Sequence, residues 1–182
     1  MSLKKAKKQL ANISPRDKNR MPFENNNKED NVIIVSRRIE KEYFSKAISY
    51  CKENGATVTD LLLASFIDAL GKIAGIGAED KISVACATDL RRHIKDTSTL
   101  GYTNHVSFVH CALEQKGDNL KDTLRRVSKR MKEVKEDKFM GLHGLPLLNF
   151  AYKSMVYLQA ETIVKLFYKN PVLSVSNVGA ID

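Results

Sequence analysis

The stretch from Lys81 to Val109, KISVACATDLRRHIKDTSTLGYTNHVSFV, decides the fold that we expect for this chain. It contains two apolar alternations, formed by Ile82, Val84 and Cys86 and by Val106, Phe108 and His110. Successive side chains of a strand point to opposite faces, so alternation at period two is what a half-buried strand requires. The stretch therefore predicts two strands joined by the polar segment 89–99.

The segments before this stretch predict one strand and two helices. A β-branched run over 31–38 predicts a strand, and helical spacing of apolar residues over 39–54 predicts an amphipathic helix. Thr57 and Asp60 have the spacing of a capping box at the start of the next helix, 58–73. That helix is apolar almost all round, so we expect it to be the central buried helix, packed on a sheet.

The segments after the stretch complete an α/β pattern. Asp118 is the expected N-cap of a helix with an apolar line from Leu120 to Val134. Residues 139–168 predict one or two helices packed on the sheet and bent at 141–146, and residues 172–176 predict a last strand. The order of elements predicts an α/β fold, a two-layer α+β sandwich in which helices back a mixed β-sheet.

Composition indicates one soluble domain. The chain has 182 residues, of which 43% are hydrophobic and 28% charged. No run approaches the roughly 18–20 apolar residues of a membrane span, and no secretory signal is evident, so we expect a cytoplasmic protein without membrane contact. The cysteines, Cys51, Cys86 and Cys111, all fall in apolar patterns, which indicates buried thiols in a reducing compartment rather than disulfides or metal ligands.

Most of the net charge of +9 belongs to the N-terminal end. The first 20 residues carry seven basic side chains and one acidic side chain, a net +6, so the other 162 residues carry only +3. Residues 1–30 predict a basic and polar lead-in or linker, and residues 31–182 the folded domain. This distribution does not favour nucleic acid as the partner of the folded surface.

Several motifs together resemble one family. The segment Ala87 to Arg92, followed by Leu100 to Asn104, resembles the C-terminal half of the chloramphenicol-acetyltransferase-like superfamily, which includes alcohol acetyltransferases and the condensation domains of nonribosomal peptide synthetases. Residues 55–62 are similar to its G-x-T-x-N-D motif, and residues 169–179 to its late strand. The resemblance covers 31–182 and implies a subdomain that is incomplete at its C-terminal end. A spacing one residue shorter than in condensation domains favours the alcohol-acetyltransferase branch.

The resemblance also implies roles for individual residues. Arg91 would pair with the aspartate of an H-H-x-x-x-D-G motif in the N-terminal half of the fold. Asn104, Ser176 and Asn177 would line the active-site tunnel. The alternatives are a surface arginine at a strand end for Arg91 and a turn residue for Asn104.

The chain itself lacks that histidine motif. Acyl transfer needs a base to take a proton from the nucleophile, and the four histidines, His93, His105, His110 and His143, are isolated in the sequence. None is followed by an aspartate four residues later, and none has cysteine or acidic residues at a spacing typical of metal ligands. We therefore expect no catalytic residue, no metal and no tightly bound cofactor in this chain, and little or no activity of the chain alone.

The resemblance implies part of an acyltransferase. Such an enzyme moves an acyl group from coenzyme A or a phosphopantetheine thioester on a carrier protein to an alcohol or amine. On the basic helix, Arg125, Arg126 and Lys129 would contact coenzyme A or the carrier, although a solvated face with intrahelical partners is the simpler interpretation. The alternative function is a non-catalytic binding or assembly module that holds a carrier protein or self-associates.

Overall fold

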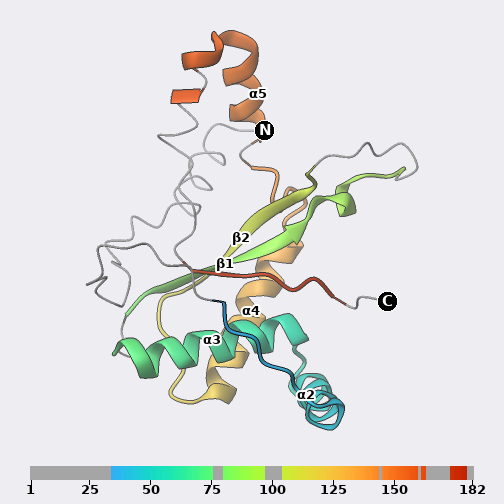
Figure 1. Ribbon diagram of the computed structural model, residues 1–182, viewed down its shortest axis with the longest axis vertical. Helices are drawn as coiled ribbons and strands as arrows, with labels where there is room; N and C mark the ends of the chain where they lie inside the picture. The colour runs from blue at the N-terminus through green and yellow to red at the C-terminus, as the bar shows by residue number, and fades with distance from the viewer. Residues whose placement is uncertain are drawn as a thin grey trace. The chain divides into compact units, whose positions relative to one another are not determined.

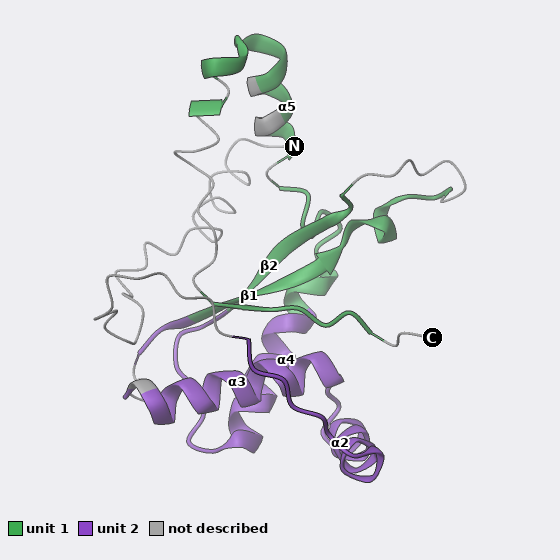
Figure 2. Ribbon diagram, viewed as in Figure 1, with its two compact units in different colours: residues 1–16, 83–111, 133–182 green, residues 17–82, 112–132 purple. Residues whose placement is uncertain are grey.

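The computed structural model describes residues 34–75, 80–96, 104–143, 145–159, 161–162 and 173–179 (Figure 1). The chain divides into two compact units (Figure 2). Unit 1 comprises residues 1–16, 83–111 and 133–182, and unit 2 comprises residues 17–82 and 112–132. The helices and the small mixed sheet confirm the expected mixed α/β class. The predicted lead-in, 1–30, lies outside the described residues.

Unit 2 contains the predicted helix pair. Helix α2 spans Lys41–Glu53 and helix α3 spans Val58–Ala74, and the two contact each other. The capping box is confirmed, because Thr57 Oγ1 accepts from the Asp60 N–H at 3.2 Å and Asp60 Oδ2 accepts from the Thr57 N–H at 2.9 Å. Both helices lie within two residues of their predicted ranges, and the start of α3 is where the capping box predicts it.

Helix α3 differs from the expected all-round burial. Its core face, formed by Leu63, Ala64, Ile67 and Leu70, is buried, but Leu62 and Ile73 are exposed. An apolar side chain on a helix is buried only where another element covers it, and sequence alone does not show how many sides are covered. Helix α3 is therefore buried on one face and exposed on the other.

The predicted strand at 31–38 is wrong in its described part. Residues 34–40 have no regular secondary structure, and Ile34 and Val35 are exposed. β-Branched composition favours a strand only where the backbone finds a ladder partner and the side chains find a surface to pack on.

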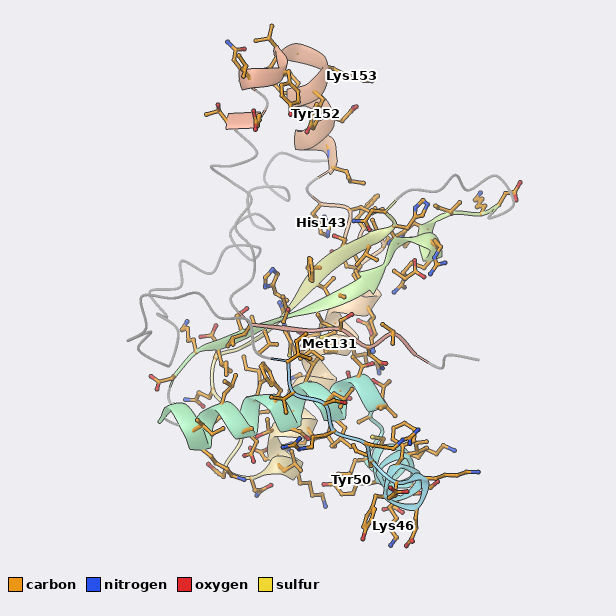
Figure 3. All side chains as sticks on the ribbon, in the orientation of Figure 1. Lys46, Tyr50, Met131, His143, Tyr152 and Lys153 are labelled. Carbon is orange, nitrogen blue, oxygen red and sulfur yellow. The ribbon has the colours of Figure 1, made fainter. Side chains whose placement is uncertain are left out.

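The long basic helix is α4, which spans Leu120–Glu136. It starts in unit 2 and its last residues belong to unit 1. Thr123, Leu124, Val127 and Met131 are buried on one face. Figure 3 labels Met131. The N-cap is Asn119 rather than Asp118, because Asn119 Oδ1 accepts from the Asp122 N–H at 3.0 Å. Either side chain can cap a helix, and the structure places the first turn one residue later.

Unit 1 contains most of a three-stranded sheet with the order β2-β1-β3. Strand β1 spans Ile82–Asp89 and β2 spans Val106–Leu113, which confirms both strands of the opening stretch. The Leu90 N–H donates to the His105 carbonyl at 2.8 Å, so the end of β1 meets the start of β2 and the two strands are antiparallel. Between them, Leu90–His93 form the short 3₁₀ helix η1.

The predicted last strand is shorter than expected. Strand β3 consists of Ser174–Val175 and runs parallel to β1, with Ala85 opposite Ser174 and Cys86 opposite Val175. Because one neighbour of β1 is antiparallel and the other parallel, the sheet is mixed, as the sequence predicts. The buried side chains of unit 1 include Val84, Ala85, Cys86, Val109, Cys111 and Met140.

Helix α5 spans Leu145–Ser154, within the region expected to pack on the sheet. Its described side chains are all exposed, including Phe150 and Tyr152. The predicted bend is confirmed at Gly141, whose φ is +78°, but Pro146 lies in the first turn of the helix. Proline is tolerated there because the first helical N–H groups have no acceptor within the helix.

Candidate functional site

The residues that the sequence assigns to a tunnel wall lie at one end of the unit 1 sheet. Arg91 follows the end of β1, and Asn104 precedes the start of β2 beside it. Since β3 is parallel to β1, Ser176 and Asn177 leave β3 at that same end. We name Asp89, Arg91, Asn104, Ser176 and Asn177 the strand-end cluster. In a sheet the ends of strands present side chains that the ladder itself does not use, so this is where a site is expected.

Arg91 makes a forked contact with Asp89 in this cluster. Its Nε lies 2.9 Å from both carboxylate oxygens of Asp89, and its Nη2 lies 2.8 Å from Oδ2. The Arg91 backbone N–H donates to the same carboxylate at 2.9 Å. The side chains are 60% and 51% exposed, so water and other anions reach both partners. The carboxylate with which Arg91 pairs inside this chain is therefore Asp89.

The ion pair shifts both titrations. The hydrogen bonds from the Arg91 side chain and backbone hold the pKa of Asp89 below its usual range, with a smaller contribution from His105. The carboxylate in turn raises the pKa of Arg91. Both shifts favour the charged forms, so the cluster contains a carboxylate and a guanidinium that stay ionised at neutral pH.

The three other members of the cluster have local or solvent-facing positions. Asn104 Oδ1 accepts from the Val106 N–H at 2.9 Å, which makes Asn104 the residue that turns the chain into β2. Asn177 Oδ1 accepts from the Gly179 N–H at 3.0 Å. Ser176 and Asn177 are both exposed. These side chains are accessible at the sheet end, and each asparagine also shapes its own turn.

A turn between α4 and α5, residues 137–143, docks on the same end of the sheet. Ser107 Oγ donates to the Gly141 carbonyl at 2.9 Å, and His93 Nε2 lies 2.8 Å from the Met140 carbonyl. A Cβ on Gly141 would lie 2.8 Å from Leu90 Cδ2. Only glycine combines this positive φ with so close an approach, so Gly141 fixes the turn against the hairpin.

This turn gives His143, which is labelled in Figure 3, the carboxylate partner that it lacks in the sequence. Its Nε2 lies 2.7 Å from Asp137 Oδ2, and its side chain is 12% exposed. Nδ1 is buried and has no hydrogen-bond partner among the residues that the structure describes. Asp137 thus holds the His143 ring as a carboxylate holds a catalytic imidazole. However, Nδ1 of His143 is closed to solvent, so in this conformation the pair orients the turn rather than a substrate.

The other histidines do not assemble into a catalytic group. Among the described residues, buried His105 Nε2 has no hydrogen-bond partner, and His93 Nε2 lies 2.8 Å from the Met140 carbonyl, to which it can only donate. His110 lies within β2. Within the described ranges, no three histidine, cysteine or acidic side chains are placed to share a metal ion.

The proposed carrier-binding residues lie on α4, but they differ in their surroundings. Asp122 accepts from Arg125 at 2.7 Å and from Arg126 at 3.0 Å. The hydrogen bond from Arg125, together with Arg126, holds the pKa of Asp122 below its usual range although burial opposes the shift. Lys129 is exposed and has no ion pair with any described residue. Of the three predicted contacts, only Lys129 has its charge unshared.

Two side-chain contacts were not predicted from the sequence. Asp89 is the acceptor of Arg91, and the Asp-x-Arg spacing is a signal that could have revealed it. Asp137 is the partner of His143 six residues later, and no regular spacing predicts that contact because it depends on the shape of the turn.

In the part of the chain that the structure describes, no helix has both the length and the apolar composition needed to cross a lipid bilayer. Comparison with models of protein families, with curated proteins and with solved structures found no match to this chain.

Proposed function

We propose that this chain is part of an acyltransferase, of the chloramphenicol-acetyltransferase-like superfamily, acting in the cytoplasm. It supplies the tunnel wall that lacks the catalytic histidine, and acyl groups pass from coenzyme A or a carrier-protein thioester to an alcohol or amine. We also propose that the helices cover the mixed sheet in the same arrangement as in the C-terminal subdomain of that superfamily. The proposed partner is an N-terminal half of the same fold, which supplies the histidine motif.

The strand-end cluster is the observation that carries this proposal. The four residues chosen from the resemblance, Arg91, Asn104, Ser176 and Asn177, come from three separate segments that adjoin their strands at the same end of one sheet. A guanidinium at this position is suited to receive a carboxylate of an incoming chain, because a charge-assisted fork of hydrogen bonds is strong and directional.

The contact between Arg91 and Asp89 is one that another carboxylate could replace. Both side chains are about half exposed, and an exposed ion pair contributes little stability. Arg91 can therefore exchange Asp89 for a carboxylate of the N-terminal half at small cost. In the chain alone, Asp89 keeps the guanidinium in place until that partner arrives.

The test combines the native size of the gene product with an activity measurement. We expect an intact mass near 45–50 kDa in the source cells, about the size of two ordinary domains, with the histidine motif upstream. We expect the present chain alone to release no thiol from acetyl-coenzyme A in the presence of alcohols or amines. Acyl transfer by the chain alone that is abolished by changing one of its four histidines would contradict the proposed division of roles.

A second candidate function is a binding or assembly module. It is favoured by the apolar side chains that α5 and the residues after it expose, namely Leu145, Phe150, Tyr152, Val156, Tyr157 and Leu158. Exposed apolar groups that cluster in one segment indicate a contact surface. A native mass equal to that of this chain, together with reversible self-association in analytical ultracentrifugation, would favour this candidate over the acyltransferase.

A further inference from the structure

We propose that the outward face of α4 binds an acidic α-helical segment of a partner protein. The face carries four exposed cations, Lys121, Arg125, Lys129 and Lys132, which we name the cationic stripe. Their spacings of four, four and three residues place them on one side of the helix. At a rise of 1.5 Å per residue, the stripe is about 16 Å long.

The charges of the stripe are largely unshared. Among the described residues, Lys121, Lys129 and Lys132 form no ion pair. Arg125 donates to Asp122, yet its side chain remains 80% exposed. The stripe thus presents three free ammonium groups and one accessible guanidinium to solvent.

Like charges repel one another within the stripe, although Glu133 and Glu136 lie four residues after Lys129 and Lys132 and offset part of that repulsion. Lys121 and Arg125, Arg125 and Lys129, and Lys129 and Lys132 are neighbours on the helix surface, and like charges at these spacings repel. The buried residues of the opposite face, Leu124, Val127 and Met131, hold the helix in place against that repulsion. Opposite charges on a partner would compensate this repulsion, so binding of an acidic partner would stabilise the helix.

An α-helix is the partner whose charges match the stripe. Glutamates at positions i, i+4, i+8 and i+11 of a second helix have the same rise as the four cations, so each cation can meet one carboxylate. A phosphate backbone fits less well. Exposed Glu133 and Glu136 follow the stripe at its C-terminal end, and a continuous polyanion would pass over them. On a partner helix the carboxylates can be confined to the length of the stripe, so that none lies opposite those glutamates.

The surface differs from the one that the sequence indicates. Arg126 lies one position beyond Arg125 and is tied to Asp122, with a side chain only 37% exposed. Lys121 and Lys132 replace it, because they share the side of Arg125 and Lys129. The stripe would serve this role in either proposed function, whether the partner helix belongs to a carrier protein or to another assembly component.

The test uses a fluorescent 16-residue alanine-based peptide with glutamates at i, i+4, i+8 and i+11. We expect fluorescence anisotropy to show binding in 20 mM salt that disappears in 0.5 M salt, because ion pairs of exposed groups are screened. The variant K121Q/K129Q/K132Q should bind about tenfold more weakly, since it removes three exposed ion pairs. The control variant K41Q/K52Q/K138Q removes three exposed lysines elsewhere and should change the affinity less than about twofold.

Four outcomes would overturn the proposal. They are the absence of peptide binding, an equal loss in both triple variants, equal affinity for a peptide of the same composition with scattered glutamates, and tighter, stripe-dependent binding of a DNA duplex. An equal loss would assign the binding to net charge, and the DNA result would assign the stripe to nucleic acid. Far-UV circular dichroism of each variant checks that glutamine, a good helix former, has left α4 intact.

Discussion

The guanidinium of Arg91 lies 2.9 Å, through its Nε, from both carboxylate oxygens of Asp89, two residues before it. The contact joins the last residue of β1 to the turn that follows, so one short segment provides both charges of the strand-end cluster. It also leaves the pair open to solvent, so the pair can exchange partners.

Replacing Arg91 by glutamine, R91Q, should raise the pKa of Asp89 toward its usual range. Hydrogen bonds from Arg91 are the largest cause of the low pKa of Asp89, and the variant removes those of its side chain. Carbon-13 NMR of the carboxyl group during an acid titration measures the change. R92Q is the matched control, because Arg92 contacts the Met140 sulfur at 3.8 Å and has no described carboxylate partner.

The same pair sets the sign of one pH effect. Because the pKa of Asp89 is lower in the folded chain than in the unfolded chain, its contribution is present above the usual aspartate range and is lost as the pH falls through the lowered pKa. Wild type should therefore lose stability relative to D89N on acidification. Parallel stability curves of the two proteins from neutral pH to acid would show that the pair contributes nothing measurable.

Substituting Gly141 by alanine should destabilise the turn between α4 and α5. The new Cβ would lie 2.8 Å from Leu90 Cδ2 and 3.2 Å from Thr88 Cγ2 in a backbone with φ of +78°. Gly179 has the same φ and open space around it, so G179A isolates the backbone cost of about 1–2 kcal/mol. G141A should lose that amount and about 1–3 kcal/mol more from the clash, measured by urea unfolding.

Equal losses in the two glycine variants would mean that the turn moves away from the hairpin without cost. The NMR signal of the His93 ring provides a second check. If the turn is displaced in G141A, the contact between His93 Nε2 and the Met140 carbonyl, 2.8 Å long in the wild type, is lost. The His93 ring signals should then shift in G141A and stay in place in G179A.

The contact between His143 and Asp137 should appear as a coupling in a double-mutant cycle. D137A leaves a buried imidazole N–H without an acceptor, which costs about 1–3 kcal/mol. H143L removes the imidazole, and in the double variant neither partner remains. We expect a coupling energy of about 0.5–3 kcal/mol between the two changes. The cycle cancels the bond that Asp137 Oδ1 accepts from the Phe139 N–H, and additive losses would show that the pair is not coupled.

Local signals in the sequence predicted most elements, and contacts between distant segments produced the exceptions. Alternation predicted β1 and β2, and Thr57 with Asp60 predicted the start of α3, because these signals act within a few residues. Residues 34–38 have the composition of a strand but no described ladder partner, and composition cannot supply one. For the same reason, the sequence overestimated the burial of α3 and of the 145–158 segment.

The candidate site divides in the same way. The resemblance selected Arg91, and parallel pairing of β3 with β1 then brought Ser176 and Asn177 to its end of the sheet. The local Asp-x-Arg contact was within reach of sequence reasoning. The contact of Asp137 with His143 was not, because a turn with a positive φ at Gly141 closes it and no periodic pattern encodes that geometry.

The last prediction concerns Gly117, where α4 approaches the chain before it. A Cβ on Gly117 would overlap the Thr123 backbone nitrogen and lie 2.6 Å from the Asp122 carbonyl carbon, so backbone would have to move. The Gly117 N–H also donates to the fully buried Thr123 hydroxyl at 3.1 Å. G117A should therefore lose about 1–3 kcal/mol of stability or more.

Gly71 is the matched control in the same unit. A Cβ there would meet only the flexible side chain of Lys116, at 3.1–3.2 Å, and alanine is favoured over glycine inside a helix by about 0.5–1 kcal/mol. G71A should thus be neutral or stabilising, because Lys116 can move away at little cost. Urea unfolding of both variants measures the difference, and a G117A protein as stable as G71A would show that the start of α4 can shift without loss.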